Sequence, residues 1–221
     1  MVAPKLHPPR EKGSPMATRP PANLREHLRL VTRGAHLRLE AEVDFDGRLT
    51  SLEVYRSFLE SFFRFVRPVE AVLDGLDLKM LGIDYSSRRK TCWIETDLRD
   101  LGHTSESLEH LQSFGELPEL TEPVEALGAM YVLEGSSLGR QVMLSKLAER
   151  LNIRPDWAGH FFSGYGKETG TMWRSFVTIL NEVGKAQDDA RLIEASALAT
   201  FAAFEKCLGE SRMRGGEQRA S

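Results

Sequence analysis

Apolar residues recur at intervals of three and four along most of the chain, which is the spacing of one face of an α-helix. Leu24, Leu28, Val31 and Ala35 follow this spacing, and Asn23 is in position to cap the first turn. No run alternates apolar and polar residues for long enough to form a sheet, and no segment is repeated. The sequence therefore predicts an all-α fold, with helical segments at roughly 24–42, 51–73, 93–101, 124–151, 168–183 and 188–208.

Three segments lack this periodicity. Residues 1–22 are rich in proline and basic residues but lack the apolar core of a secretory signal, so we expect a disordered tail and consider Met16 an alternative start. Residues 74–92 mix glycines with the cluster Arg88-Arg89-Lys90 and predict no clear element. Residues 210–221 read as a polar tail. A single helical domain is therefore expected over 23–209.

Composition excludes several classes of protein. With 41% hydrophobic and 28% charged residues, the chain has the balance of a globular protein that buries a core. A formal net charge of -3 disfavours nucleic acid as a partner, and no apolar run approaches the ~20 residues needed to span a membrane. Cys92 and Cys207 form no CxxC motif, so neither a disulfide framework nor covalent cofactor attachment is indicated. We expect a cytoplasmic protein.

The first helical segment carries a polar stripe. Arg29, Thr32, Arg33, His36 and Glu40 follow one another at intervals of three and four, so they lie along one side of the helix. The carboxylate of Glu40 could accept the Nδ1 proton of His36 and leave Nε2 free to bind a metal, and the arginines suit an anionic ligand. Spacing alone favours a simpler interpretation, which is a solvated helix face with one incidental histidine.

A second unusual segment is Tyr131 to Gln141, in which Gly135 and Gly139 lie one turn apart within an otherwise helical pattern. Glycine inside a helix costs ~1 kcal/mol relative to alanine, so both positions need a reason. Close approach of the backbone to a flat ligand is one reason, and close packing against another helix is the other. The sequence leaves these two interpretations open.

The segment Phe161 to Arg174 is a glycine-rich turn that opens onto a helix. It lacks the spacing of a phosphate-binding loop, so a structural turn is favoured, with Arg174 as either a surface charge or an anion contact. No paired Glu-x-x-His motif of a di-iron bundle is present, since Asp100-x-x-His103 stands alone.

Together these three segments resemble the heme oxygenase family. Leu28 to Glu40 resembles the family's proximal helix, in which basic residues precede an iron-ligating histidine and a glutamate follows one turn later. Tyr131 to Gln141 resembles the glycine-containing distal helix. Its sequence, like that of Phe161 to Arg174, resembles the sequences of the bacterial subgroup associated with bacteriophytochromes. The resemblance implies a single-domain helical bundle that holds heme between a proximal and a distal helix.

On the proximal side, the resemblance makes His36 the axial ligand of the heme iron and Glu40 the residue that orients it. Arg29 matches a basic residue that meets a heme propionate. Arg174 falls near the place of a second propionate contact. These two arginines would fix the rotation of the ring.

On the distal side, the resemblance implies that Gly135 and Gly139 let the backbone approach the heme, and that Tyr131 and Arg140 contact it. Two positions depart from the family. Gly139-Arg140 stands where many relatives have Gly-Gly, and Ser136 stands where the better-known animal and pathogen enzymes have an aspartate. Arg140 could lean away along the helix, or it could narrow the distal pocket and impair oxygen activation.

The activity implied by the resemblance is oxidative cleavage of heme to biliverdin, carbon monoxide and ferrous iron. Heme b is both substrate and cofactor, O2 is consumed, and a reductase or ferredoxin supplies electrons. A bacteriophytochrome is the acceptor that the subgroup suggests. Two alternatives share the fold: a non-catalytic heme-binding or heme-delivery protein, and a thiaminase-like enzyme with a catalytic cysteine, for which Cys92 and Cys207 have no supporting motif.

Overall fold

The computed structural model describes residues 23–44, 47 and 49–219, so the predicted tail at 1–22 lies outside the described residues. In this part of the chain the regular elements are helices, and isolated bridges at Arg154 are the only β-type pairing. The prediction of an all-α fold is confirmed. In chain order the elements are α1 (Leu24–Val31), α2 (Arg33–Val43), α4 (Leu52–Asp74), the 3₁₀ helices η1 (Leu78–Leu81) and η2 (Tyr85–Arg88), α5 (Thr91–Asp100), α6 (Ser105–Glu109), α7 (Pro123–Gly135), η3 (Ser136–Gly139), α8 (Arg140–Leu151), α9 (His160–Ser163), η4 (Gly166–Glu168), α10 (Thr169–Val183) and α11 (Gln187–Arg219).

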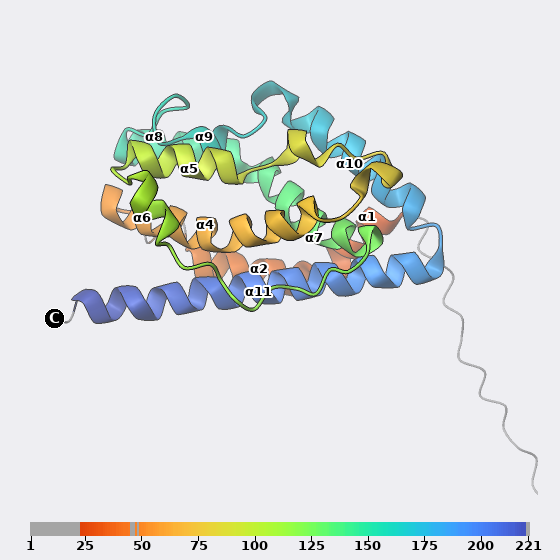
Figure 1. Cartoon of the computed structure of the whole chain (residues 1–221). Helices are drawn as coiled ribbons and strands as arrows, with labels where there is room; N and C mark the ends of the chain where they lie inside the picture. The colour runs from red at the N-terminus through yellow and green to blue at the C-terminus, as the bar shows by residue number, and fades with distance from the viewer. Residues whose placement is uncertain (1–22, 45–46, 48, 220–221) are drawn as a thin grey trace, which may run out of the picture.

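The helices are arranged in three layers (Figure 1). One layer holds α5, α8 and α9, the middle layer holds α4 and α7, and the third holds α2 and the long α11. α4 packs on α5 on one side and on α11 on the other, while α11 also packs along α7. Because α4 and α7 are covered on both sides, they supply much of the buried apolar surface.

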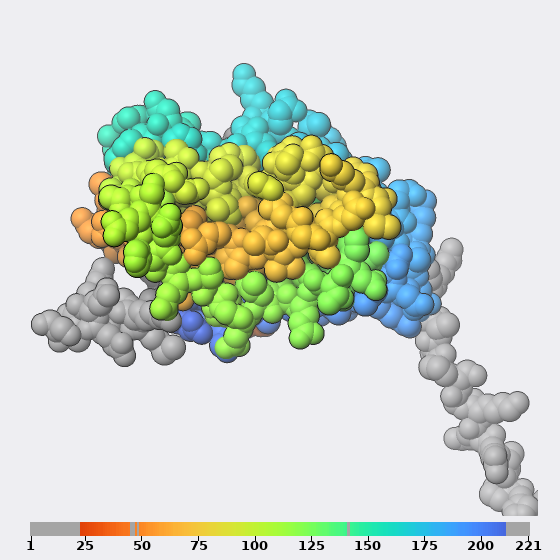
Figure 2. Space-filling view, in the orientation of Figure 1, coloured from red at the N-terminus to blue at the C-terminus, as the bar shows by residue number. Residues whose placement is uncertain are grey.

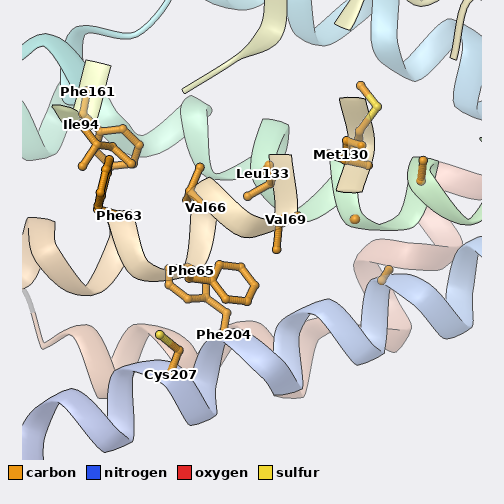
Figure 3. Close-up of a cluster of buried hydrophobic side chains, with 14 of the residues drawn as sticks. Phe63, Phe65, Val66, Val69, Ile94, Met130, Leu133, Phe161, Phe204 and Cys207 are labelled. Carbon is orange, nitrogen blue, oxygen red and sulfur yellow. The ribbon is translucent and has the colours of Figure 1, made fainter. Parts of the chain in front are cut away.

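The core joins the middle layer to α11 (Figure 3). The ring of Phe65 on α4 stacks on that of Phe204 on α11, with centroids 4.5 Å apart and planes 11° from parallel. Met130 and Leu133 on α7 and Cys207 on α11 are buried in the same cluster. Burying one such side chain contributes about 1.5–3 kcal/mol, so this contact holds the two layers in register.

α7 and α11 approach each other closely at Gly128. A Cβ atom at this position would lie 2.6 Å from the backbone nitrogen of Ala197 and would also overlap Ser196. The Ser196 hydroxyl donates a hydrogen bond of 2.7 Å to the carbonyl of Glu125, which ties the two helices together at the same level. Gly128 is therefore required for packing, and this position was not singled out in the sequence.

The first helical segment is divided in two. The sequence pattern predicts one helix over 24–42, and that prediction is wrong because α1 ends at Val31 and α2 begins at Arg33. Thr32 lies between them with φ −88° and ψ −3°, and its hydroxyl donates to the carbonyl of Leu28 at 2.7 Å. A threonine hydroxyl bonded to the carbonyl four residues back bends a helix, which accounts for the break.

The segment predicted as one helix over 124–151 is also interrupted. α7 ends at Gly135, and residues Ser136–Gly139 form the 3₁₀ helix η3 before α8 begins. The Ser136 hydroxyl donates to the carbonyl of Leu133 at 2.8 Å, so it stabilises the end of α7 locally. The pattern identified the glycines as anomalous but not the tighter turn that they accompany.

The last helix is longer than predicted. The apolar pattern ends near 208, where a polar tail was expected from 210, but α11 continues to Arg219. Glutamate, arginine and methionine are good helix formers, so helix can continue after the apolar stripe has ended. Within the described residues, no helix is both long enough and apolar enough to cross a membrane.

Residues between α4 and α7 cover one face of the molecule (Figure 2). They include α6, which the sequence pattern did not predict. Two arginines of α4 hold this segment: Arg67 donates to the carbonyls of Leu108 and Leu111, and Arg64 donates to that of Gln112. α1 and α2, which carry the predicted site residues Arg29, His36 and Glu40, lie on another side of the molecule.

Candidate functional site

A cavity of about 410 Å³ lies between α1 and α2, the end of α7 with η3, and α11. Its walls are largely apolar and include Phe62 and Val66 of α4, Phe201 and Phe204 of α11, and Trp173 of α10. This volume falls within the range of sites that bind small molecules or cofactors. An apolar cavity of this size can receive a flat organic ligand.

Most of the predicted site residues meet at this cavity. Those that line it are Arg29, His36, Tyr131, Gly135, Ser136 and Arg140. The three that lie outside its lining are Glu40, Gly139 and Arg174. Segments a hundred residues apart in the sequence, α1 with α2 and α7 with η3, are thus brought to one place.

His36 projects from α2 with its side chain 55% exposed. Its Nδ1 atom lies 3.5 Å from Oε1 of Glu40, one turn further along the helix. Its ring packs edge-on against that of Phe201, with ring centroids 6.1 Å apart. Within the described residues, Nε2 of His36 has no protein partner. This is the arrangement in which a carboxylate orients a histidine and leaves the other ring nitrogen available to a metal.

Three arginines line the cavity at successive turns of α1 and α2. Arg25, Arg29 and Arg33 are spaced by four residues, and within the described chain no carboxylate lies within ion-pair distance of any of them. Of these, only Arg29 was expected to contact a ligand, although the interval of four predicts that Arg25 faces the same side. Three cations without acidic partners at one cavity favour an anionic ligand.

Arg174 is placed differently from the expectation. It is exposed on α10, and its Nη2 atom donates to Thr171 Oγ1 on the same helix at 3.2 Å. Trp173, its neighbour in the chain, faces the cavity instead. The structure therefore does not bring Arg174 to the cavity, and Arg25 and Arg33 supply the additional positive charge.

The two glycines of the α7–η3 segment do not serve helix packing. A Cβ atom at Gly139 would meet nothing within 4 Å, and one at Gly135 would make ordinary contact with Trp173 at 3.8 Å. Their φ angles, −87° and −59°, are accessible to any residue. Of the two interpretations left open by the sequence, close packing against another helix fails, and Gly135 lies in the cavity wall.

Arg140 is buried, with 4% of the residue exposed. Its guanidinium donates to the Ser136 hydroxyl at 2.9 Å and to the carbonyl of Phe161 at 3.2 Å, and it lies 4.0 Å from the centre of the Phe161 ring. Burial lowers the pKa of Arg140 to about 10, so it remains charged at neutral pH. Arg140 thus lines the cavity and does not lean away along the helix, and the Ser136 hydroxyl accepts one of its hydrogen bonds.

The family model described as heme oxygenase matches residues 22–210, which is almost all of the described chain. The chain belongs to the heme oxygenase family. Among curated relatives, heme oxygenase PigA of Pseudomonas aeruginosa is 28% identical over 192 residues, covering 86% of this chain and 93% of the relative. A heme oxygenase of Xanthomonas campestris pv. campestris is 28% identical over 160 residues, covering 71% of this chain and 89% of the relative.

Solved heme oxygenase structures share the fold. The Neisseria meningitidis heme oxygenase in its NO- and CO-bound forms superposes with a TM-score of 0.69 at 21% identity, covering 86% of this chain and 92% of that chain. The heme oxygenase from Leptospira interrogans gives a TM-score of 0.68 at 17% identity, covering 85% and 99%. The expected heme oxygenase-like helical fold is confirmed.

Beside the cavity, this heme oxygenase family member holds a buried ion network that the sequence did not reveal. Lys90 and Glu134 are each 1% exposed, and Lys90 Nζ donates to Glu134 Oε1 at 2.7 Å. The Tyr165 hydroxyl also donates to Glu134 at 2.7 Å, and Arg88 lies 3.3 Å from its other oxygen. Burial lowers the pKa of Lys90, and the charge of Glu134 opposes this shift. The cluster Arg88-Arg89-Lys90 was the only sequence signal.

A second polar cluster joins α5 to α9. Asp97 accepts hydrogen bonds from the backbone nitrogens of His160 and Phe161 at 2.7 and 2.9 Å, and from Nδ1 of His160 at 2.9 Å. Asp100 accepts from the backbone nitrogen of Ala158 at 2.7 Å. Because these carboxylates bind the backbone at the start of α9, the cluster acts as a helix cap. It holds Phe161, and with it the acceptor for Arg140, in place.

Proposed function

We propose that this protein is a heme oxygenase that binds heme b in the 410 Å³ cavity and cleaves it to biliverdin, carbon monoxide and ferrous iron. One observation carries the proposal: His36 shares an apolar cavity with three arginines, and in the part of the chain that the structure describes, Nε2 of His36 has no partner and the arginines have no acidic one. Membership of the heme oxygenase family supports the same function.

The residues of the cavity fit heme. The aromatic wall formed by Phe201, Phe204 and Trp173 suits a flat apolar macrocycle. A neutral imidazole is a common ligand of heme iron, and guanidinium groups pair with carboxylates such as the two propionates. Gly135 presents no side chain to the cavity. The apolar aromatic wall, the histidine donor and the positive charge of the cavity therefore support heme as its ligand.

The role of the histidine follows from its contact with Glu40. A carboxylate at 3.5 Å favours the tautomer with the proton on Nδ1, which leaves the lone pair of Nε2 directed away from it. The edge of the Phe201 ring restricts rotation of the imidazole. When bound, heme supplies the iron that activates O2 and the ring that is opened. The chain itself binds and orients this group.

Orientation of the ring in its plane depends on the arginines. Arg25, Arg29 and Arg33 lie along about two turns of helix, so they can hold two propionates at one edge of the cavity. Held in this way, the ring would not rotate in its plane, so Arg25, Arg29 and Arg33 would fix which edge of it faces the wall formed by Gly135 and Ser136. The choice of the cleaved carbon would follow from this geometry.

The finer parts of the proposal concern partners and location. Heme and O2 are the expected substrates, and an external reductase or ferredoxin is the electron donor that the family resemblance implies. The sequence of Tyr131 to Gln141 resembles that of the subgroup associated with bacteriophytochromes, and this resemblance supports a bacteriophytochrome as the acceptor of biliverdin. Cysteine usage supports a cytoplasmic location.

One observation favours a second candidate function, a non-catalytic heme-binding protein. Arg140 is buried in the cavity wall and donates to the Ser136 hydroxyl, so Ser136 is less available to organise water in the cavity. The thiaminase-like alternative gains no support: Cys207 is buried, and burial raises the pKa of the Cys92 thiol, which makes both cysteines poor nucleophiles.

The test compares two histidine variants. His36→Ala should abolish the histidine-ligated heme spectrum and the formation of biliverdin from hemin, O2 and a reductant, and imidazole should restore part of both. His27→Ala is the matched control, because His27 lies on the neighbouring helix and pairs with Glu194 at 2.7 Å outside the cavity. An unchanged iron–histidine band in the His36 variant would refute the assignment, and a normal heme spectrum without biliverdin in the wild type would favour the heme-binding protein.

A further inference from the structure

The buried charges beside the cavity do not balance around Arg140. Glu134 is the nearest buried carboxylate of the network, and it is already paired with Lys90 at 2.7 Å and with Arg88 at 3.3 Å. Within the described residues, no carboxylate lies within ion-pair distance of Arg140. Its two hydrogen-bond partners, the Ser136 hydroxyl and the Phe161 carbonyl, are both neutral. Arg140 is therefore a buried cation without an anionic contact.

The position of this cation is fixed. The guanidinium is held by hydrogen bonds from two of its nitrogens and lies over the Phe161 ring at 4.0 Å. Phe161 is in turn held by its backbone hydrogen bond to Asp97 at 2.9 Å. A guanidinium carries five N–H groups, and two of them make these bonds. Because Arg140 also lines the cavity, its remaining N–H groups can serve a ligand there.

On the basis of the proposed heme site, in which Arg25, Arg29 and Arg33 hold the propionates, we infer that Arg140 binds small inorganic anions in this cavity and selects them over neutral ligands of similar size. A buried positive charge is strongly stabilised by a contacting anion because little water is present to screen the interaction. Its pKa of about 10 keeps the group charged across the neutral range. The same charge would favour any step in which a small ligand in the cavity becomes negatively charged.

This inference gives Arg140 a role that differs from simple obstruction. If the side chain only narrowed the cavity, it would weaken the binding of all small ligands, whether neutral or charged. The charge of a fixed cation does not weaken the binding of neutral ligands, but it strengthens the binding of anions. The sign of the difference between an anion and a neutral ligand therefore separates the two roles.

The experiment uses the full chain loaded with hemin. Fluoride and azide are titrated into the ferric protein, and carbon monoxide into the reduced protein, with the absorption spectrum as the readout. Arg140→Gln removes the charge, and Arg140→Met removes it while keeping an unbranched stem over Phe161, so a folded neutral variant is available from two designs. Arg64→Gln is the control, because Arg64 is a buried arginine that does not line the cavity.

Both neutral variants should bind fluoride and azide about ten- to a hundredfold more weakly, the usual range for loss of a hydrogen bond to a charged group. Carbon monoxide affinity should change by less than about threefold, and the control should leave all three affinities unchanged. Unchanged anion affinities, or equal losses for anions and carbon monoxide, would overturn the inference. Failure of the wild type to form a His36-dependent heme complex would instead refute the proposed function, so the two failures are distinguishable.

Discussion

Three glycines of α7 and η3 lie in different surroundings, and alanine at Gly128 should change stability in the opposite direction from alanine at Gly135 or Gly139. At Gly128 a Cβ would overlap Ser196 and the backbone of α11. Since the backbone cannot move without separating the two helices, Gly128→Ala should lower the free energy of unfolding by about 3 kcal/mol, the upper part of the range for overpacking. At Gly135 and Gly139 the Cβ meets ordinary contacts or open space.

Because φ and ψ at Gly135 and Gly139 suit any residue, alanine there removes conformational freedom from the unfolded chain at no steric cost. Each change should raise the free energy of unfolding by about 0.5–1 kcal/mol, and the double variant by about 1–2 kcal/mol. For a chain of this size, that corresponds to a rise of about 2–8 °C in the midpoint of thermal unfolding. Urea unfolding and thermal melting of the heme-free protein measure both quantities.

Larger side chains at the same positions should instead affect hemin binding. Gly135→Leu places a side chain in the cavity, so hemin binding should weaken although the heme-free protein stays folded. Gly139→Leu should have a smaller effect, because Gly139 lies outside the cavity lining. If alanine at 135 or 139 destabilised the heme-free protein as Gly128→Ala does, these glycines would serve packing, and the argument that they serve a ligand would be refuted.

Two further predictions concern the charged residues around the cavity. The double change Arg25→Gln with Arg33→Gln should weaken hemin binding by about five- to twentyfold, whereas Arg174→Gln should leave it unchanged, and equal effects in a hemin titration would contradict the assignment of propionate contacts. Lys90→Met should lower the free energy of unfolding by about 3 kcal/mol, because it removes the closest cation from a buried carboxylate. Urea unfolding measures this loss, and a variant as stable as the wild type would show that the pair contributes little net stability.

The sequence predicted elements well where local pattern determines structure. The aromatic face over 51–73 became α4 at Leu52–Asp74, since Tyr55, Leu59 and Phe63 repeat at helical spacing and are all buried. It failed where one side chain decides between helix and a break. The helix propensity of threonine permits a helix at Thr32. Its hydroxyl can either bond to the Leu28 carbonyl or point to solvent, and periodicity does not distinguish these two options.

The candidate site shows the same division. The stripe that contains Arg29 and His36 could be placed on one helix face, because intervals of three and four are fixed by helix geometry. The position of Arg174 could not, since the rotation of α10 about its axis depends on packing, and its neighbour Trp173 turned toward the cavity instead. The expectation for Arg140 was open for a similar reason, and its burial depends on Phe161, 21 residues away.

The pairing of Lys90 with Glu134 is the part of the site furthest from what sequence can reveal, and it also explains how the cavity wall is held. The two residues are separated by 44 positions, and each taken alone reads as a surface charge. Glu134 immediately precedes Gly135, so the ion pair fixes the end of α7 where the wall begins, while Lys90 also lines the cavity. Gly135 has no side chain of its own to anchor this part of the wall by packing. The buried pair supplies an anchor at the preceding residue, so Gly135 can line the cavity without leaving this segment loose.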